Sequence, residues 1–139
     1  MRSVSSVLAA IASAALAACG SASVPTPTAP APATVTDVFS GSIVQLGSAA
    51  FPFTVTATGS VQVSLTAVAP LTTMALGIDI GSWNGTTCTV GIAKNDHAKS
   101  GATALSGTAT TGTYCVQVSD SGNIPPDSTV TFTVQIMHS

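Results

Sequence analysis

Charged residues are scarce in this sequence. Lys, Arg, Asp and Glu together make up 6% of its 139 residues, where about a quarter is usual. After the first 18 residues the basic side chains are Lys94 and Lys99 alone, against five aspartates, and glutamate is absent throughout. Such a surface lacks the basic patch that nucleic acid or an anionic bilayer requires. We therefore expect no nucleic-acid partner and a surface covered mainly by Thr, Ser and Gly.

The side chains that carry catalysis and metal binding are equally few. The two histidines, His97 and His138, lie far apart in the sequence, and no G-x-S-x-G nucleophile motif occurs. Acid–base catalysis and metal binding need several such groups at one point. We therefore predict no catalytic residue, no metal ion and no cofactor, so that the protein is not an enzyme. A triad assembled from distant positions is the alternative.

Long apolar runs are missing after residue 18, where none approaches the ~20 residues that a membrane-spanning helix needs. The N-terminal segment is different. Arg2 forms a minimal basic region, and the stretch from Val4 to Ala18 is apolar apart from small serines, with the length of about 15 residues that suits a signal peptide. The stretch ends in the tetrapeptide Leu16-Ala17-Ala18-Cys19.

This tetrapeptide resembles the lipobox of bacterial lipoproteins. The resemblance implies that the chain is cut before Cys19, that the thiol of Cys19 receives a diacylglyceryl group, and that the new amine is often acylated. Two or three acyl chains anchor a protein stably to a membrane. We predict an anchor in the bacterial cell envelope, with the domain facing the periplasm or the exterior. The outer membrane is preferred, because Gly20 replaces the Asp that retains enterobacterial lipoproteins at the inner membrane. The alternative is an ordinary secretory signal cut near Ala18 or Ala22.

The segment after Cys19 is a linker by composition. Residues 20–34 read GSASVPTPTAPAPAT, in which Pro alternates with small residues. Such segments form a semi-rigid polyproline spacer of about 3.1 Å per residue. We therefore divide the chain into a signal peptide at 1–18, a lipidated cysteine with a disordered linker at 19–34, and a folded domain at 35–139.

The domain alternates apolar and polar residues with a period of two, as β-strands do. The clearest run places Val130, Phe132, Val134 and Ile136 between Thr and Gln residues, and turn signals such as Asn84-Gly85 separate the runs. Seven or eight short strands without a helix predict an all-β fold, a single antiparallel β-sandwich of jelly-roll or Ig-like type. We expect Val90 and Ile92 to face the core. The other predicted core residues are Phe51, Phe53, Val63, Leu65, Leu76, Ile78, Tyr114, Val116, Phe132 and Val134.

Several strings in the domain resemble bacterial pre-peptidase C-terminal domains. These strings are FPFTVTATGSVQVSLTAV, TGTYCVQVSD and TVTFTVQI, and the resemblance covers about residues 38–137. It implies a secreted, jelly-roll-like β-sandwich of the kind appended to exported proteases. Some members bind calcium through Asp and Glu clusters. This chain has no such cluster and no attached peptidase, and it carries Cys88 and Cys115, so no metal site is transferred to it.

Cys88 and Cys115 are the thiols that remain once Cys19 is lipidated. An exported protein meets an oxidising compartment, so we predict a disulfide between them. The bond would stabilise the fold by about 3.5 kcal/mol in the chain-entropy model. Alternation places Cys88 on the same face as Val90 and Ile92, which we expect to point to the core. It places Cys115 on the face opposite to the core-facing Tyr114 and Val116. A bulge or a strand end must therefore bring the two cysteines to one face. Two free buried thiols are the alternative.

Two short segments are the candidates for ligand contact. Trp83 is the single Trp and precedes the turn signal Asn84-Gly85, which we interpret as a turn and not as a glycosylation site. Trp83 either caps the core or stacks on a sugar ring or on a side chain of a partner protein. Residues 94–99 read as an exposed hairpin loop. The predicted contact residues are Trp83, Asn84, Asn95, Asp96 and His97.

These features predict a membrane-anchored, non-catalytic binding or adhesion module. Its partners would be membrane lipid, through the acyl chains of Cys19, and a glycan or protein ligand. One alternative is a structural envelope lipoprotein without a specific ligand. The other is an accessory or inhibitor domain of a secreted hydrolase.

Overall fold

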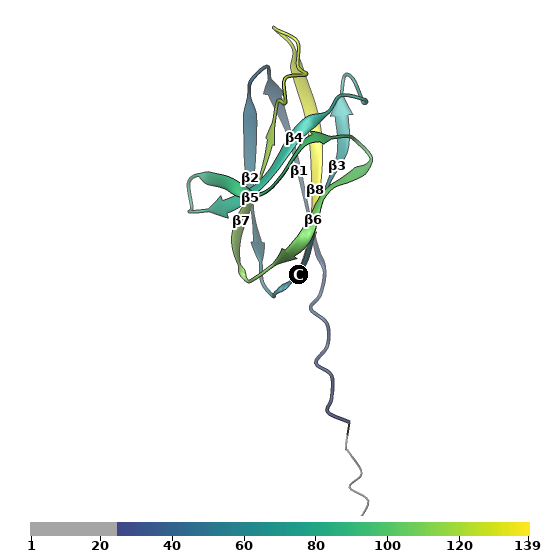
Figure 1. The fold of residues 1–139 in the computed structure, drawn as a ribbon, viewed down its shortest axis with the longest axis vertical. Coiled ribbons are helices and arrows are strands. Elements are labelled where there is room, and N and C mark those ends of the chain that lie inside the picture. Colours follow the sequence, from purple (N-terminus) through teal and green to yellow (C-terminus); the bar gives the residue numbers. More distant parts are fainter. Residues whose placement is uncertain (1–24) are drawn as a thin grey trace, which may run out of the picture. The chain divides into compact units, whose positions relative to one another are not determined.

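The computed structural model describes residues 25–139, which fold mainly into β-strands (Figure 1). Residues 25–34 form no regular secondary structure and are exposed. Within residues 25–139 no helix is long and apolar enough to cross a membrane. Both Cys19 and the predicted signal peptide lie outside the described residues. The strands are β1 (Val35–Val44), β2 (Ser48–Val55), β3 (Gly59–Ala69), β4 (Leu76–Trp83), β5 (Cys88–Ala98), β6 (Ala102–Ala109), β7 (Gly112–Ser119) and β8 (Thr129–His138).

The eight strands form two antiparallel sheets of four. Sheet A has the order β1-β8-β3-β6, and sheet B has the order β2-β7-β4-β5. All connections except the β4–β5 hairpin cross from one sheet to the other. This order is that of the jelly roll, an eight-stranded double sheet of two Greek keys. The predicted single β-sandwich is confirmed, and of the two topologies left open the chain adopts the jelly roll.

The core fills the space between the two sheets with the apolar faces of the strands. Most of the predicted core side chains are buried, while Phe51 and Tyr114 are half-buried and pack against the core. Phe51 stacks on Phe39 and meets the edge of Phe132, with ring centroids 5.1 and 6.0 Å apart. The buried members of the predicted set are Phe53, Val63, Leu65, Leu76, Ile78, Val116, Phe132 and Val134.

The expectation that Val90 and Ile92 face the core is wrong. Val90 is 43% exposed and Ile92 is 58% exposed. The reason is a β-bulge in β5: Ile80 pairs with Ala93, but the next residue of β4, Gly81, pairs with Val90. A bulge of this kind interrupts alternation and turns a side chain in a new direction. Val90 therefore faces outward, and Ile92 lies at the edge of the sandwich.

The predicted hairpin loop at residues 94–99 is also wrong in its position. Lys94 to Ala98 are strand residues at the end of β5, and the connection to β6 begins at Lys99. The segment is polar because β5 is an edge strand, and charged residues are common on such edges.

Cys88 and Cys115 are joined by a disulfide, with Cα atoms 5.7 Å apart. The prediction is thus confirmed, and the bond joins the two strands that flank β4. Cys115 pairs with Gly81 and Cys88 pairs with Trp83 at the end of the same strand. Alternation had placed the two cysteines on opposite faces of the sheet. They lie on the same face because Val90, which shares the face of Cys88, points outward and not toward the core. Both cysteines lie on the face of sheet B that points away from the core.

Candidate functional site

Trp83 and Asn84 lie at the tip of the β4–β5 hairpin. Trp83 is half-buried, but it is not among the side chains that pack against the hydrophobic core. Asn84 Oδ1 accepts hydrogen bonds from the amides of Thr86 and Thr87 at 3.0 and 2.8 Å, and Asn84 Nδ2 donates to Thr87 Oγ1 at 2.8 Å. Side-chain bonds of this kind build the turn itself. Asn84 therefore holds the hairpin tip, and the half-buried Trp83 lies beside it.

The second predicted segment is separate from the first. Asn95 Nδ2 donates to the carbonyl of Ala104 at 2.8 Å, and Asn95 Oδ1 accepts from the amide of His97 at 2.9 Å. Asn95 therefore links the edge strands β5 and β6. Cys88, which pairs with Trp83, is separated from Asn95 by roughly 20 Å of strand at about 3.3 Å per residue. The structure does not bring Trp83 and His97 into one site.

Asp96 belongs to a small charged cluster on the outer face of sheet B. Its Oδ1 lies 3.1 Å from Lys94 Nζ, and Lys94 pairs with Asp79 of β4. Burial raises the pKa of Asp79, which is 8% exposed; the Lys94 ammonium opposes this rise and the Asp96 carboxylate adds to it. The pKa of Lys94 is raised, mainly by its hydrogen bond to Asp96 and by the negative charge of Asp96. The negative charge of Asp79 makes a smaller contribution in the same direction. Lys94 thus balances two carboxylates in what we interpret as an ion-pair cluster.

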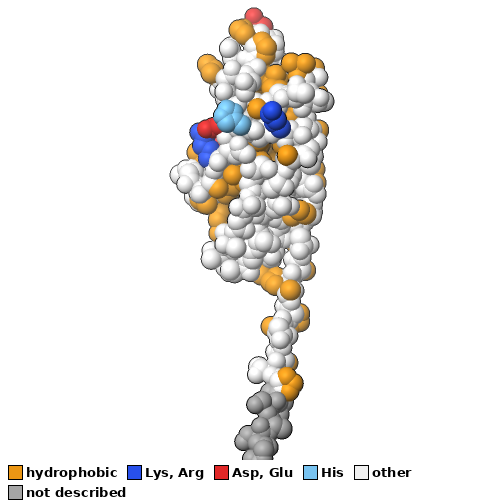
Figure 2. Space-filling model, turned by 45° about the vertical axis from the view of Figure 1, so that its right-hand side comes forward, with side chains coloured by type: hydrophobic (Ala, Val, Ile, Leu, Met, Phe, Trp, Pro, Cys, Tyr) orange, Lys and Arg blue, Asp and Glu red, His pale blue; other side chains and the backbone are white. Residues whose placement is uncertain are grey.

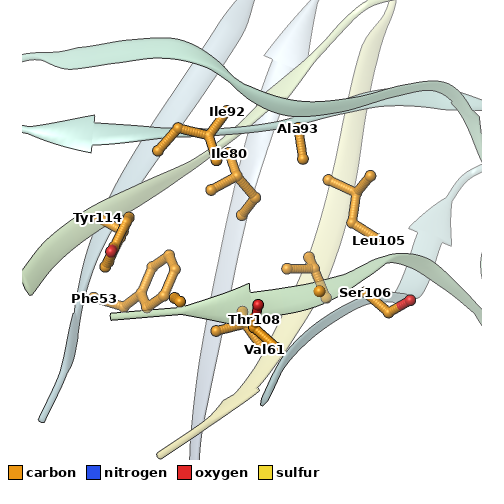
Figure 3. Close-up of a pocket in the computed structure, with 12 residues that line it drawn as sticks. Phe53, Val61, Ile80, Ile92, Ala93, Leu105, Ser106, Thr108 and Tyr114 are labelled. Carbon is orange, nitrogen blue, oxygen red and sulfur yellow. The ribbon is translucent and has the colours of Figure 1, made fainter. Parts of the chain in front are cut away.

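An apolar groove lies between the edge strands β5 and β6. Its volume is about 210 Å³. Figure 3 shows side chains from both sheets pointing toward a common space, with Ile80, Ile92 and Ala93 on one side and Leu105 on the other. The lining residues are Phe53, Val61, Val63, Ile80, Ile92, Ala93, Leu105, Ser106, Gly107, Thr108, Ala109 and Tyr114.

The groove exists because the inner face of β6 is incompletely filled. Residues 105, 107 and 109 share that face, since their partners on β3 are Val63, Val61 and Gly59. They are Leu, Gly and Ala, and a Cβ atom built on Gly107 would meet no atom within 4 Å. On the opposite wall, the bulge in β5 places Ile92 at the mouth. Sequence reasoning missed this site, although a glycine inside a strand is a known sign of irregular packing.

Charge is absent from the groove and concentrated elsewhere. The lining contains no Asp, Glu, His, Lys or Arg. Figure 2 shows one face on which basic, acidic and His side chains gather in a single band, apart from an acidic side chain at the top. A second, more open hollow lies over β1, β8 and β3 and is lined mostly by Ser, Thr, Ala and Gly. The groove between β5 and β6 is therefore the stronger candidate for binding an apolar group.

Metal binding finds no support in the described part of the chain. No group of three or more His, Cys, Asp or Glu side chains there is arranged to hold a metal ion. His138 is buried, with Nε2 3.0 Å from Asp37 Oδ2, while His97 is exposed on β5. The two histidines stand on β8 and β5, which belong to different sheets.

Comparison with known proteins does not assign this chain to a family. The chain matches no protein-family model and no curated protein sequence. The resemblances to the lipobox and to pre-peptidase C-terminal domains therefore stay predictions.

Proposed function

We propose that this chain is an exported bacterial lipoprotein, anchored through Cys19, whose jelly-roll domain is a non-catalytic binding module. The groove between β5 and β6 is the observation that carries the proposal. It is concave, apolar and uncharged, and its walls come from strands of both sheets. Preformed apolar concavities of this kind are the usual sites of ligand binding. The anchor is supported by the lipobox, the apolar segment before it and the Pro-rich linker after it.

Binding is favoured over catalysis by the placement of the ionisable side chains. Lys94 lies between Asp79 and Asp96, and Asp37 lies beside His138. These side chains interact with one another within the fold, and none of them lines the groove. A general acid or base must reach the bound substrate to transfer a proton. The groove therefore offers contact area, and its lining contains no Asp, Glu, His, Lys or Arg.

The hairpin tip at Trp83 is a second candidate contact. Trp83 is partly exposed and is not packed into the core, which favours a contact role over that of a core plug. Indole rings are frequent anchors of protein and glycan binding. We nevertheless prefer the groove, because it offers side chains from both sheets to one ligand.

Filling the groove is the experiment that tests the proposal. Gly107→Leu and Ala93→Leu fill it from opposite walls, and Thr103→Leu adds the same side chain to the outer face of β6 as a control. The probe is Nile red, a neutral apolar dye, and the protein is the exported chain carrying Cys19→Ala so that acyl chains and detergent are absent. We expect dye binding by the parent and by Thr103→Leu, and at least a tenfold loss in both filled variants.

Methyl chemical shifts locate the dye. Changes in methyl chemical shift that are confined to Ile80, Ile92 and Leu105 would support binding of the dye in the groove. Shifts confined to the hairpin around Trp83 would move the site to the second candidate. An absence of specific binding would overturn the proposal and favour a structural envelope lipoprotein or an accessory domain without its own ligand.

A further inference from the structure

We infer that β6 binds an extended, uncharged polypeptide segment of a partner protein, which joins sheet A as an additional strand and places apolar side chains in the groove. The inference depends on the proposed function, since the groove is the same site. It adds the chemical class of the ligand and the way in which the ligand is held.

The four edge strands of the sandwich differ in how they are protected against such pairing. An exposed edge offers unpaired N–H and C=O groups to any extended chain, and proteins block this with charges, prolines and bulges. Edge strand β1 carries Asp37, and β2 carries Pro52. Edge strand β5 carries Lys94 and Asp96 and has two shifts of register. Strands β2 and β5 are therefore protected, whereas β1 carries its single charge near one end and has neither charge nor proline over residues 38–44; β6 differs from β1 because the apolar groove lies beside it.

The second half of β6 has no such protection. Residues 105–109 contain neither charge nor proline, and they pair with β3 in a regular register. The irregularity of β6 lies before this segment, at Ala104, and the Ala104 carbonyl is bound by Asn95. Alternate residues of an antiparallel edge strand direct their N–H and C=O groups away from the sheet. A row of main-chain donors and acceptors thus stands beside the apolar groove.

This combination selects a peptide over a small apolar molecule. In strand addition, main-chain hydrogen bonds provide affinity and pockets for alternate side chains provide specificity. A strand beside β6 would direct every second side chain inward, to the space that Gly107 leaves empty. The length of residues 105–109 corresponds to about 17 Å of strand, or five to six residues of a partner.

The chemistry of the lining defines the segment further. A charged side chain in the groove would be buried without a partner, which is costly. The inward residues of the ligand must therefore be apolar, and the groove and its ligand match in having no charge. A second copy of this chain fits less well, because its own β6 would present another Gly107 to the groove and leave the space empty.

The test uses an array of eight-residue synthetic peptides in which threonine alternates with valine, isoleucine, leucine or phenylalanine. Binding is measured to the exported chain carrying Cys19→Ala, and amide hydrogen exchange is followed in residues 105–109. We expect at least one peptide to bind and to slow exchange in this segment at least tenfold. The same peptide with alternate amides N-methylated keeps its side chains but loses hydrogen bonds, and it should bind at least tenfold more weakly.

The filled variants Gly107→Leu and Ala93→Leu should lose the peptide, and Thr103→Leu should keep it. Equal binding of the N-methylated peptide, or binding without protection of β6, would overturn strand addition while leaving the groove as an apolar site. If Nile red binds and no peptide does, strand addition is likewise wrong. Loss of both ligands would reject the proposed function as well. Self-association with protection of β6 in the absence of peptide would show that a second copy is the partner.

Discussion

At the scale of single residues, Asp120 organises one end of the sandwich. Its Oδ2 accepts a hydrogen bond from the amide of Leu46 at 3.0 Å, and its Oδ1 accepts from the amides of Gly122, Asn123 and Ile124 at 2.9, 2.9 and 3.1 Å. Partial burial by itself raises the pKa of Asp120, but these four bonds outweigh burial and the pKa is lowered. The carboxylate therefore ties the β1–β2 turn to the β7–β8 connection.

This arrangement predicts an acid-dependent contribution to stability. Because the pKa of Asp120 in the folded state lies below its usual value of 3.8, folding favours the charged form. The contribution is complete above the usual pKa and is lost as the pH falls through the folded pKa. We expect Asp120→Asn to lower the free energy of unfolding at pH 7, with a smaller difference from the parent at pH 2, as measured by urea unfolding.

Asp127→Asn is the control for this prediction, since it changes the same charge at an exposed position of the same connection. At pH 7 it should lower the free energy of unfolding less than Asp120→Asn does, because the four main-chain amides bond to Asp120. An equal effect of the two substitutions would show that overall charge, and not the hydrogen bonds of Asp120, sets the profile.

Asn84 and Asn95 show that a polar residue near a turn can serve the fold through hydrogen bonds within the protein. Both were predicted as ligand contacts because they are polar and lie near turn signals. Asn84 bonds within its own turn, whereas Asn95 bonds to Ala104 on the neighbouring edge strand. The partners of Asn84 are Thr86 and Thr87, two and three residues along the chain, and such short-range bonds are typical of turns. The bond between Asn95 and Ala104 depends on how the two sheets come together, which the local sequence does not specify.

At the scale of elements, the β4–β5 hairpin depends on a glycine. A Cβ atom at Gly81 would overlap the backbone of Thr89 and Val90. Backbone atoms cannot move aside without distorting the strand that bears Cys88. The close approach of β5 to β4 therefore requires the absence of a side chain at this position.

We predict that Gly81→Ala lowers the free energy of unfolding by about 1–3 kcal/mol, as overpacking does. Gly107→Ala is the matched control, because a Cβ there meets no atom within 4 Å, and its effect should lie within about 0.5 kcal/mol or be stabilising. Denaturant unfolding of the oxidised protein measures both. Equal losses in the two variants would mean that strand glycines, and not the contact with Thr89, control stability.

The bulge in β5 explains why alternation failed in that strand and succeeded in β8. Strand β8 is central in sheet A and pairs with β1 in a regular register, and the one shift in its pairing with β3 lies in β3, at Thr66, so β8 itself keeps its alternation. Strand β5 is held on one side alone, and Gly91, with φ of +131°, supplies a conformation that other residues rarely adopt. The same bulge exposes Ile92 and opens the mouth of the groove. Of the two misassigned residues, Ile92 therefore lies at the candidate site.

At the scale of the whole molecule, the lipid anchor is the prediction with the largest consequence. Intact-mass analysis of the membrane-associated protein should show a chain that begins at Cys19 and carries two or three acyl groups. Cys19→Ala should release the protein into a soluble fraction, because acylation provides the attachment to the membrane. A soluble, unacylated protein from the parent gene, cut near Ala18 or Ala22, would contradict the prediction.

The class of fold, the strands and most of the core could be predicted from the order of the residues. Alternation identifies the faces of central strands, because both faces of such a strand have a defined environment. The disulfide also followed from the sequence, on the expectation that Cys19 is lipidated and that the protein is exported to an oxidising compartment, which leaves two cysteines to pair.

The strand order, and hence the choice of the jelly roll over the Ig-like fold, became known only from the folded chain. The same holds for the groove, which needs Gly107 of one sheet to stand opposite the bulged Ile92 of the other. Local periodicity describes which way a side chain points within a strand. It does not describe which strands become neighbours or how closely two edges meet, because these depend on contacts between residues distant in sequence.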